Sequence, residues 1–124
     1  PKGATTKVRV QTRAFIESVE RASLLISDRI KSPLRVKFEG NTIASTCSTA
    51  LGKASDRIAA SVEGASLEIG FNNRYLLDAL KNADCDEITV ELSGALSPMK
   101  ISPVAGESFL FLVLPVRLKN EASS

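Results

Sequence analysis

The sequence predicts one α+β domain built from two similar halves. Each half contains an alternating apolar segment, then a segment with helical spacing, then three further alternating segments. No linker rich in Gly, Pro or Ser separates the halves, and 124 residues with 44% hydrophobic and 24% charged residues suit one globular domain. We therefore expect two βαβββ units whose two helices pack side by side on antiparallel sheets.

The first half opens with a strand and a helix. Val8 and Val10 alternate with polar residues, as in a strand with one buried face. Over residues 13–27 apolar residues recur at helical spacing, and Thr12 is the expected N-cap. The apolar positions of this helix are Phe15, Val19, Ala22 and Ile26.

Three strands are predicted after this helix. Residues 34–39 alternate between apolar and charged side chains, and Gly40 and Asn41 form a tight turn into residues 42–49. Residues 55–62 complete the half as its last strand.

The second half repeats this order. Residues 67–71 alternate as a strand, Asn72 is the expected N-cap, and residues 73–83 carry one apolar helical face. Three strands follow, at residues 88–92, 99–101 and 109–118. We expect the single domain to span residues 1–118 and a polar tail to span residues 119–124.

Several functional classes are disfavoured by composition. The chain has no His, so the commonest general base is missing, and its glycines form no phosphate-binding loop. Cys47 and Cys85 are far apart and belong to no Cys or His cluster, so we expect free thiols, no metal and no cofactor. The longest apolar run, residues 109–115, is too short to span a bilayer, and the first residues lack a secretory signal. We expect a cytoplasmic, non-catalytic protein.

Charge is unevenly distributed along the chain. Nine basic and three acidic residues give residues 1–37 a net charge of +6, which leaves −4 for the remainder. A basic end can attract a polyanion even when the net charge of the whole chain is only +2.

Three segments together resemble the bacterial β sliding clamp, the DNA polymerase III β subunit. They are Ile-Gly-Phe-Asn-Asn-Arg-Tyr-Leu-Leu-Asp-Ala-Leu at residues 69–80, Leu-Ser-Pro-Met-Lys-Ile at 96–101 and Leu-Pro-Val-Arg-Leu at 114–118. The resemblance covers essentially the whole chain and is to the C-terminal, third domain, with the DNA-clamp fold. It implies three such domains per polypeptide and two copies closing head to tail, as a homodimer ring, around duplex DNA. The tail at residues 119–124 and the missing first two domains depart from the family pattern.

The resemblance implies a groove that receives short hydrophobic motifs, of the QLxLF kind, from the polymerase catalytic subunit, the clamp loader and repair proteins. Aliphatic and aromatic side chains would form an apolar pocket, and polar side chains at its rim would hydrogen-bond the peptide. The implied groove residues are Asn72, Tyr75, Leu96, Pro98, Leu112, Leu114, Pro115, Val116 and Arg117.

Two further surfaces are implied. Leu24 falls opposite the apolar face of the first helix. The resemblance implies that this end of the helix meets the first domain of the neighbouring subunit, which makes Leu24 and Leu25 the expected contact pair. The polar sides of the helices would face DNA phosphates without reading bases, and Asp78, four residues after Arg74, is a possible ion-pair partner of it. The expected DNA-facing residues are Arg13, Arg21, Arg74 and Lys81.

Two other functions remain open on sequence alone. A small cytoplasmic α+β enzyme or ligand-binding domain could use Tyr75, Arg117 and the acidic turn at residues 84–87 as a polar pocket. A basic module that grips nucleic acid directly is the third possibility, although no aromatic residues interleave with the basic ones.

Overall fold

The structure is a computed structural model that describes residues 5–104 and 111–118. The first half contains β1 (Thr6–Gln11), α1 (Thr12–Ala22), β2 (Leu34–Glu39), β3 (Thr42–Thr49), β4 (Gly52–Ala59) and β5 (Ser61–Gly64). The second half contains β6 (Leu67–Phe71), α2 (Asn73–Lys81), β7 (Glu87–Leu92), β8 (Met99–Pro103) and β9 (Phe111–Val113). Two helices and two antiparallel sheets confirm the predicted α+β class.

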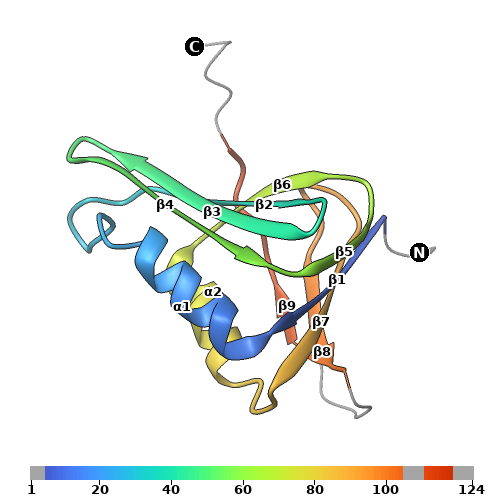
Figure 1. Cartoon of the computed structure of the whole chain (residues 1–124). Coiled ribbons are helices and arrows are strands. Elements are labelled where there is room, and N and C mark those ends of the chain that lie inside the picture. Colours follow the sequence, from blue (N-terminus) through green and yellow to red (C-terminus); the bar gives the residue numbers. More distant parts are fainter. Residues whose placement is uncertain (1–4, 105–110, 119–124) are drawn as a thin grey trace.

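The two halves exchange their first strands. One sheet has the order β4-β3-β2-β6, and the other has the order β5-β1-β7-β8-β9. Thus β6 joins the three strands of the first half, while β1 joins the three strands of the second. The helices lie side by side on the same side of both sheets, with α1 against β3 and β4 and α2 against β9 (Figure 1).

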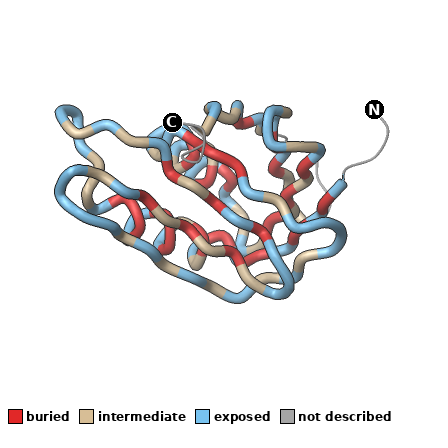
Figure 2. Tube along the Cα trace, turned by 90° about the horizontal axis from the view of Figure 1, so that it is seen from above, coloured by how far each residue is buried: buried red, intermediate tan, exposed pale blue. Residues whose placement is uncertain are grey.

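The core lies between the helices and the inner faces of the sheets. In β2, Leu34, Val36 and Phe38 are fully buried, while the alternate residues face outward. Phe15 and Val19 of α1 meet this layer. Full burial of each such side chain contributes about 1.5–3 kcal/mol of hydrophobic free energy. Buried residues run along the centres of the strands, and exposed residues concentrate at the turns (Figure 2).

The last strand predicted in each half is wrong in the same way. Residues 55–62 form two strands, because the chain leaves one sheet after Ala59 and Ser61 begins a new pairing with β1 in the other. In the second half, β9 ends at Val113, and Val116 then forms a single bridge with Gly70 in the opposite sheet. Residues 109–110 and the predicted tail at 119–124 lie outside the described residues.

The ends of α1 also differ from the prediction. Gln11, not Thr12, occupies the N-cap and provides no side-chain cap, and Thr12 is the first residue of the helix. The helix ends at Ala22 and not at residue 27, because short-range bonds such as Ile26 N–H to Ser23 O (3.0 Å) turn the chain into a loop. The second helix begins after Asn72 as predicted and ends at Lys81, two residues early.

Candidate peptide-binding groove and flanking surfaces

Exposed large apolar side chains gather among the residues predicted to form the groove. In the described part of the chain, six such side chains are strongly exposed, and two of them, Leu24 and Leu51, lie outside the predicted groove. The other four are Tyr75 (67% exposed), Leu96 (61%), Leu112 (57%) and Leu114 (69%). A single exposed leucine is common, but four of the six exposed apolar side chains belong to the predicted groove, which favours a binding surface there.

Asn72 fixes the first turn of α2 and so places Tyr75. Its Oδ1 accepts hydrogen bonds from the backbone N–H groups of Arg74 (2.9 Å) and Tyr75 (3.2 Å). The predicted cap is therefore confirmed. Because Oδ1 is engaged in the cap, the side-chain amide N–H groups of Asn72 are what it can offer a bound peptide.

The β8–β9 pair presents the leucines. Met99 lies opposite Val113 in the ladder and both are buried, so their neighbours on each strand face outward. Lys100 and Leu112 are the next opposed pair, and both are exposed. Leu114 continues the outward face of Leu112 just beyond the strand. Lys100 lies within the sequence motif at residues 96–101, which predicts no role for it.

The C-terminal segment crosses from β9 to β6 and meets the start of α2. The N–H of Val116 donates to the carbonyl oxygen of Gly70 at 2.8 Å, two residues before Asn72. A Cβ atom added to Gly70 would lie 2.4 Å from Leu118 Cδ2 and 2.9 Å from Val116 O. The absence of a side chain at Gly70 is therefore what lets the segment close on the sheet, a role that the motif Ile-Gly-Phe-Asn did not reveal.

The remaining groove residues lie in the β7–β8 connection and in the C-terminal segment. Leu96 and Pro98 are exposed in the connection between β7 and β8. In the C-terminal segment Pro115 and Val116 are half-buried and Arg117 is exposed. A cavity of about 230 Å³ is lined by Tyr75 and other residues at the start of α2 and by the loop at residues 26–32. The structure thus brings the opening of α2 and the C-terminal segment together at β6.

All four predicted DNA-facing cations lie beside a carboxylate. The pairs are Arg13 with Glu17 (3.5 Å), Arg21 with Asp56 (2.8 Å), Arg74 with Asp28 (2.5 Å) and Lys81 with Glu20 (3.3 Å). Asp28 on the loop after α1 receives the hydrogen bond from Arg74 that the sequence suggested for Asp78. The cations are exposed but partly neutralised.

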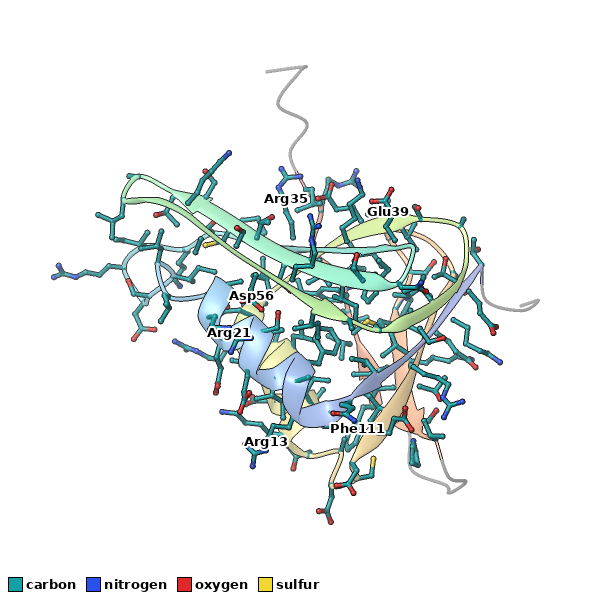
Figure 3. The ribbon with its side chains drawn as sticks, viewed as in Figure 1. Arg13, Arg21, Arg35, Glu39, Asp56 and Phe111 are labelled. Carbon is teal, nitrogen blue, oxygen red and sulfur yellow. The ribbon has the colours of Figure 1, made fainter. Side chains whose placement is uncertain are left out.

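The Arg21 and Asp56 pair has the most regular geometry of these four. The Arg21 Nε donates to Asp56 Oδ1 at 2.8 Å and a terminal nitrogen donates to Oδ2 at 3.0 Å, so the contact is bidentate. Figure 3 shows the two side chains facing each other from α1 and β4. The hydrogen bond from Arg21 lowers the pKa of Asp56, and the hydrogen bond to Asp56 raises the pKa of Arg21.

The predicted subunit contacts differ from each other in exposure. Leu24 lies in the turn after α1 and is 77% exposed. Leu25 is half-buried and packs against the core, with its Cδ1 4.0 Å from where a Cβ of Gly52 would lie. Leu24 is therefore the side chain free to contact another surface.

The cysteines and acidic residues form no metal-binding group among the described residues. No group of three or more potential metal ligands occurs there, and Cys47 and Cys85 are free thiols. Burial raises the pKa of both thiols, so both stay protonated and poorly nucleophilic near neutral pH. Within residues 5–104 and 111–118, neither helix has the length and apolarity needed to cross a membrane.

The polar pocket expected for a small enzyme would need Tyr75 and the acidic turn at residues 84–87 to lie together, but they lie at opposite ends of α2. Tyr75 lies at the start of α2, whereas Asp84 and Asp86 follow its end and line a hollow with Arg13. Six residues of α2 (76–81), at about 1.5 Å each, follow Tyr75 before the helix ends. Glu87 is paired with Arg9 at 3.3 Å. This arrangement disfavours a single site built from Tyr75 and the acidic turn.

Known proteins similar to this chain are bacterial clamps. The chain is 34% identical over 120 residues to the beta sliding clamp of Halalkalibacterium halodurans, covering 94% of this chain and 32% of that protein. It is 32% identical over 119 residues to the beta sliding clamp of Staphylococcus aureus, again covering 94% and 32%. The chain therefore spans about a third of the length of these relatives.

Solved structures agree with this similarity. The DNA polymerase sliding clamp of Bacillus subtilis superposes with a TM-score of 0.89 at 32% identity, over 96% of this chain and 32% of that one. A sliding clamp of Bartonella birtlesii bound to griselimycin gives 0.86 at 32% identity, over 95% and 32%. Residues 1–117 match the family described as DNA polymerase III beta subunit, C-terminal domain. The exchanged strands, the two helices and these similarities lead to one conclusion: the chain belongs to the family of C-terminal domains of the DNA polymerase III β subunit, the bacterial sliding clamp.

Proposed function

We propose that this chain acts as the third domain of a non-catalytic ring that encircles duplex DNA and docks partner proteins. The ring tethers the polymerase catalytic subunit, and the groove receives short motifs from the polymerase, the clamp loader and repair proteins. The proposal is supported by the exposure of Tyr75, Leu112 and Leu114, together with the backbone bridge that joins the C-terminal segment to β6 two residues before Asn72. A cytoplasmic location follows from the proposed role in replication.

A peptide suits this surface chemically. Exposed aliphatic and aromatic side chains can bury two or three apolar anchors, and a few such anchors carry most of the affinity of a peptide. The guanidinium of Arg117 and the amide N–H groups of Asn72 can donate hydrogen bonds to backbone carbonyls or carboxylates at the rim. The rest of the groove would come from the preceding domain.

Titration of a labelled QLxLF peptide into this chain tests the proposal. We expect weak but saturable binding, and a loss of roughly tenfold in affinity for Tyr75→Ala or Leu114→Ala, because each removes an apolar anchor. Arg117→Ala should weaken binding less, since an exposed donor competes with water. Leu51→Ala is the matched control, because Leu51 is as exposed (65%) as Leu114 but lies in the β3–β4 turn. Equal binding by wild type and all variants would remove the groove assignment.

The ring-closing contact is proposed at Leu24, with Leu25 beside it. Leu24 is the most exposed large apolar side chain in the described part of the chain, and a subunit contact would remove it from water. In the full-length homodimer, Leu24→Ala should shift sedimentation toward the monomer at low concentration. Leu25→Ala should also lower the melting temperature, since Leu25 packs on the core. An unchanged sedimentation profile for the double variant would contradict this contact.

A further inference from the structure

A row of alternating charges crosses the outer face of the larger sheet and ends at the groove. Strand register places five residues opposite one another across β5, β1, β7, β8 and β9. They are Glu63, Lys7, Glu91, Lys100 and Leu112. Signs alternate along the row until Leu112 begins the apolar surface. Lys100 is therefore the last charge before the predicted peptide site.

The ammonium of Lys100 is available to a ligand. Glu91, its neighbour on β7, instead pairs with Lys7 on the other side, at 3.8 Å. Among the described residues no carboxylate lies within ion-pairing distance of Lys100, and Lys100 is exposed. Opposed residues in an antiparallel pair have Cβ atoms about 4.5–5.5 Å apart, so Lys100 stands directly beside Leu112.

The other cations near the groove differ in how much positive charge they add to its rim. Arg117 is exposed in the C-terminal segment, three residues after Leu114. Arg74, next to Tyr75, is held by Asp28 and contributes less. The rim formed by Lys100 and Arg117 therefore has a positive potential next to an apolar surface, which complements an acidic residue placed among apolar anchors.

We propose that Lys100 is a specificity-determining residue that favours partner segments carrying Asp or Glu beside their apolar anchors. This inference rests on the proposed function, because it needs a peptide seated on Leu112 and Leu114. Lys100 acts through its charge and not through packing, so it changes which peptides bind more than how well a neutral peptide binds.

Matched peptides test this proposal. QLxLF peptides carrying Glu, Gln or Lys at x, or at the residue flanking either end, are titrated at low salt. At one or more of these positions the wild-type chain should bind the Glu form about threefold more tightly than the Gln form, as expected for unit charges several ångströms apart at a solvated surface. Lys100→Glu should invert this preference, so that the Glu-to-Lys affinity ratio changes by at least about tenfold. Raising the salt from about 0.05 M to 0.5 M should reduce the preference.

Two internal controls separate the possible outcomes. Lys53→Glu makes the same charge change at an exposed lysine of β4, in the other sheet and in no ion pair among the described residues, and should leave the preference unchanged. The Gln peptide should bind wild type and Lys100→Glu about equally, which reports that the groove is intact. No binding of any peptide by wild type would overturn the proposed function and this inference together. Saturable binding with a charge preference that is absent, or that survives in Lys100→Glu, would overturn this inference alone.

Discussion

At the scale of single residues, paired charges determine how the helical surface behaves. Arg21 could have been a free cation facing solvent, but Asp56 of the edge strand β4 holds it in a bidentate contact. Lys81 of α2 forms a single ion pair with Glu20 of α1, at 3.3 Å. These contacts join elements that are distant in sequence and reduce the positive potential of the surface. A helical surface of this kind suits weak, sequence-independent contact with a polyanion better than tight binding.

The pairing of Asp56 makes stability depend on pH. The hydrogen bond from Arg21 lowers the folded-state pKa of Asp56, so its stabilising contribution is complete above the unfolded pKa of about 3.9 and is lost as pH falls through the folded pKa. We expect Asp56→Asn to lower the melting temperature by about 1–3 °C at pH 7. The difference from wild type should vanish in acid, at a pH below the folded pKa of Asp56, where the carboxyl is protonated in both states. Asp86→Asn, a carboxylate in no ion pair among the described residues, is the control for calorimetry at both pH values.

Ser45 provides a second prediction at this scale. Its side chain points into the core from β3, is fully buried, and its hydroxyl has no hydrogen-bond partner among the described residues. Burial of an unpaired hydroxyl costs about 1–3 kcal/mol. Ser45→Ala removes this cost but also loses the packing contacts of the oxygen atom, so the free energy of unfolding should increase by roughly 1 kcal/mol. Ser48→Ala changes an exposed serine of the same strand and should have little effect. A lower stability of Ser45→Ala in urea titration would show that the hydroxyl has a partner.

At the scale of elements, the closing of the C-terminal segment on β6 depends on Gly70. A Cβ there would overlap Leu118 and the Val116 carbonyl oxygen, so Gly70→Ala should lower the free energy of unfolding by about 1–3 kcal/mol. Leu118→Ala removes one of the overlapping side chains. In a double-mutant cycle, the combined variant should be more stable than the sum of the single changes predicts. Strict additivity in urea titrations would mean that Leu118 does not pack on Gly70.

Periodicity correctly predicted the elements in which the order of apolar and polar residues follows directly from which side chains are buried. The alternation of Leu34, Val36 and Phe38 identified β2, and Asn72 identified the start of α2. The strand that divides after Ala59 was not predictable in this way. Ile58 and Val62 both pack against the core, so the alternation of side chains continues while the backbone changes its hydrogen-bonding partner. Periodicity reports which face a side chain occupies but not which strand lies beside it.

The same reasoning explains what could be predicted of the candidate site. The motif residues Tyr75, Leu112 and Leu114 were identified from a family resemblance, and the structure finds all three exposed. The ion-pair partners Asp28 and Asp56 could not be predicted, because they come from loops and strands whose distance from Arg74 and Arg21 only the fold determines. Lys100 could have been noticed, since it alternates with Met99 and faces the same way as Pro98.

At the scale of the whole molecule, the face formed by α1 and α2 should bind duplex DNA weakly. We expect wild type to give little or no gel shift at about 150 mM salt, because an isolated domain cannot enclose a duplex and its helix cations are paired. Glu17→Gln with Glu20→Gln releases Arg13 and Lys81, so it should produce a shift at low salt only.

The control for this experiment changes charge on the sheets. Glu63→Gln with Glu68→Gln alters the net charge by the same amount on β5 and β6, away from the helices. If this control shifts DNA as strongly as the helix variant, the net charge of the chain and not its helical face would govern binding.

The exchange of first strands has a consequence for how the chain acquires its structure. Once synthesis has passed β5 but has not reached β6, β1 is present without β7 and β2 is present without β6, so each sheet still lacks a strand that it needs. We expect neither half to remain folded when excised, whereas two polypeptides divided between β5 and β6 each carry a strand that the other's sheet requires. Such fragments should reassemble when mixed. The intact domain should fold slowly, because β1 must pair with β7, a strand that lies far from it in the sequence.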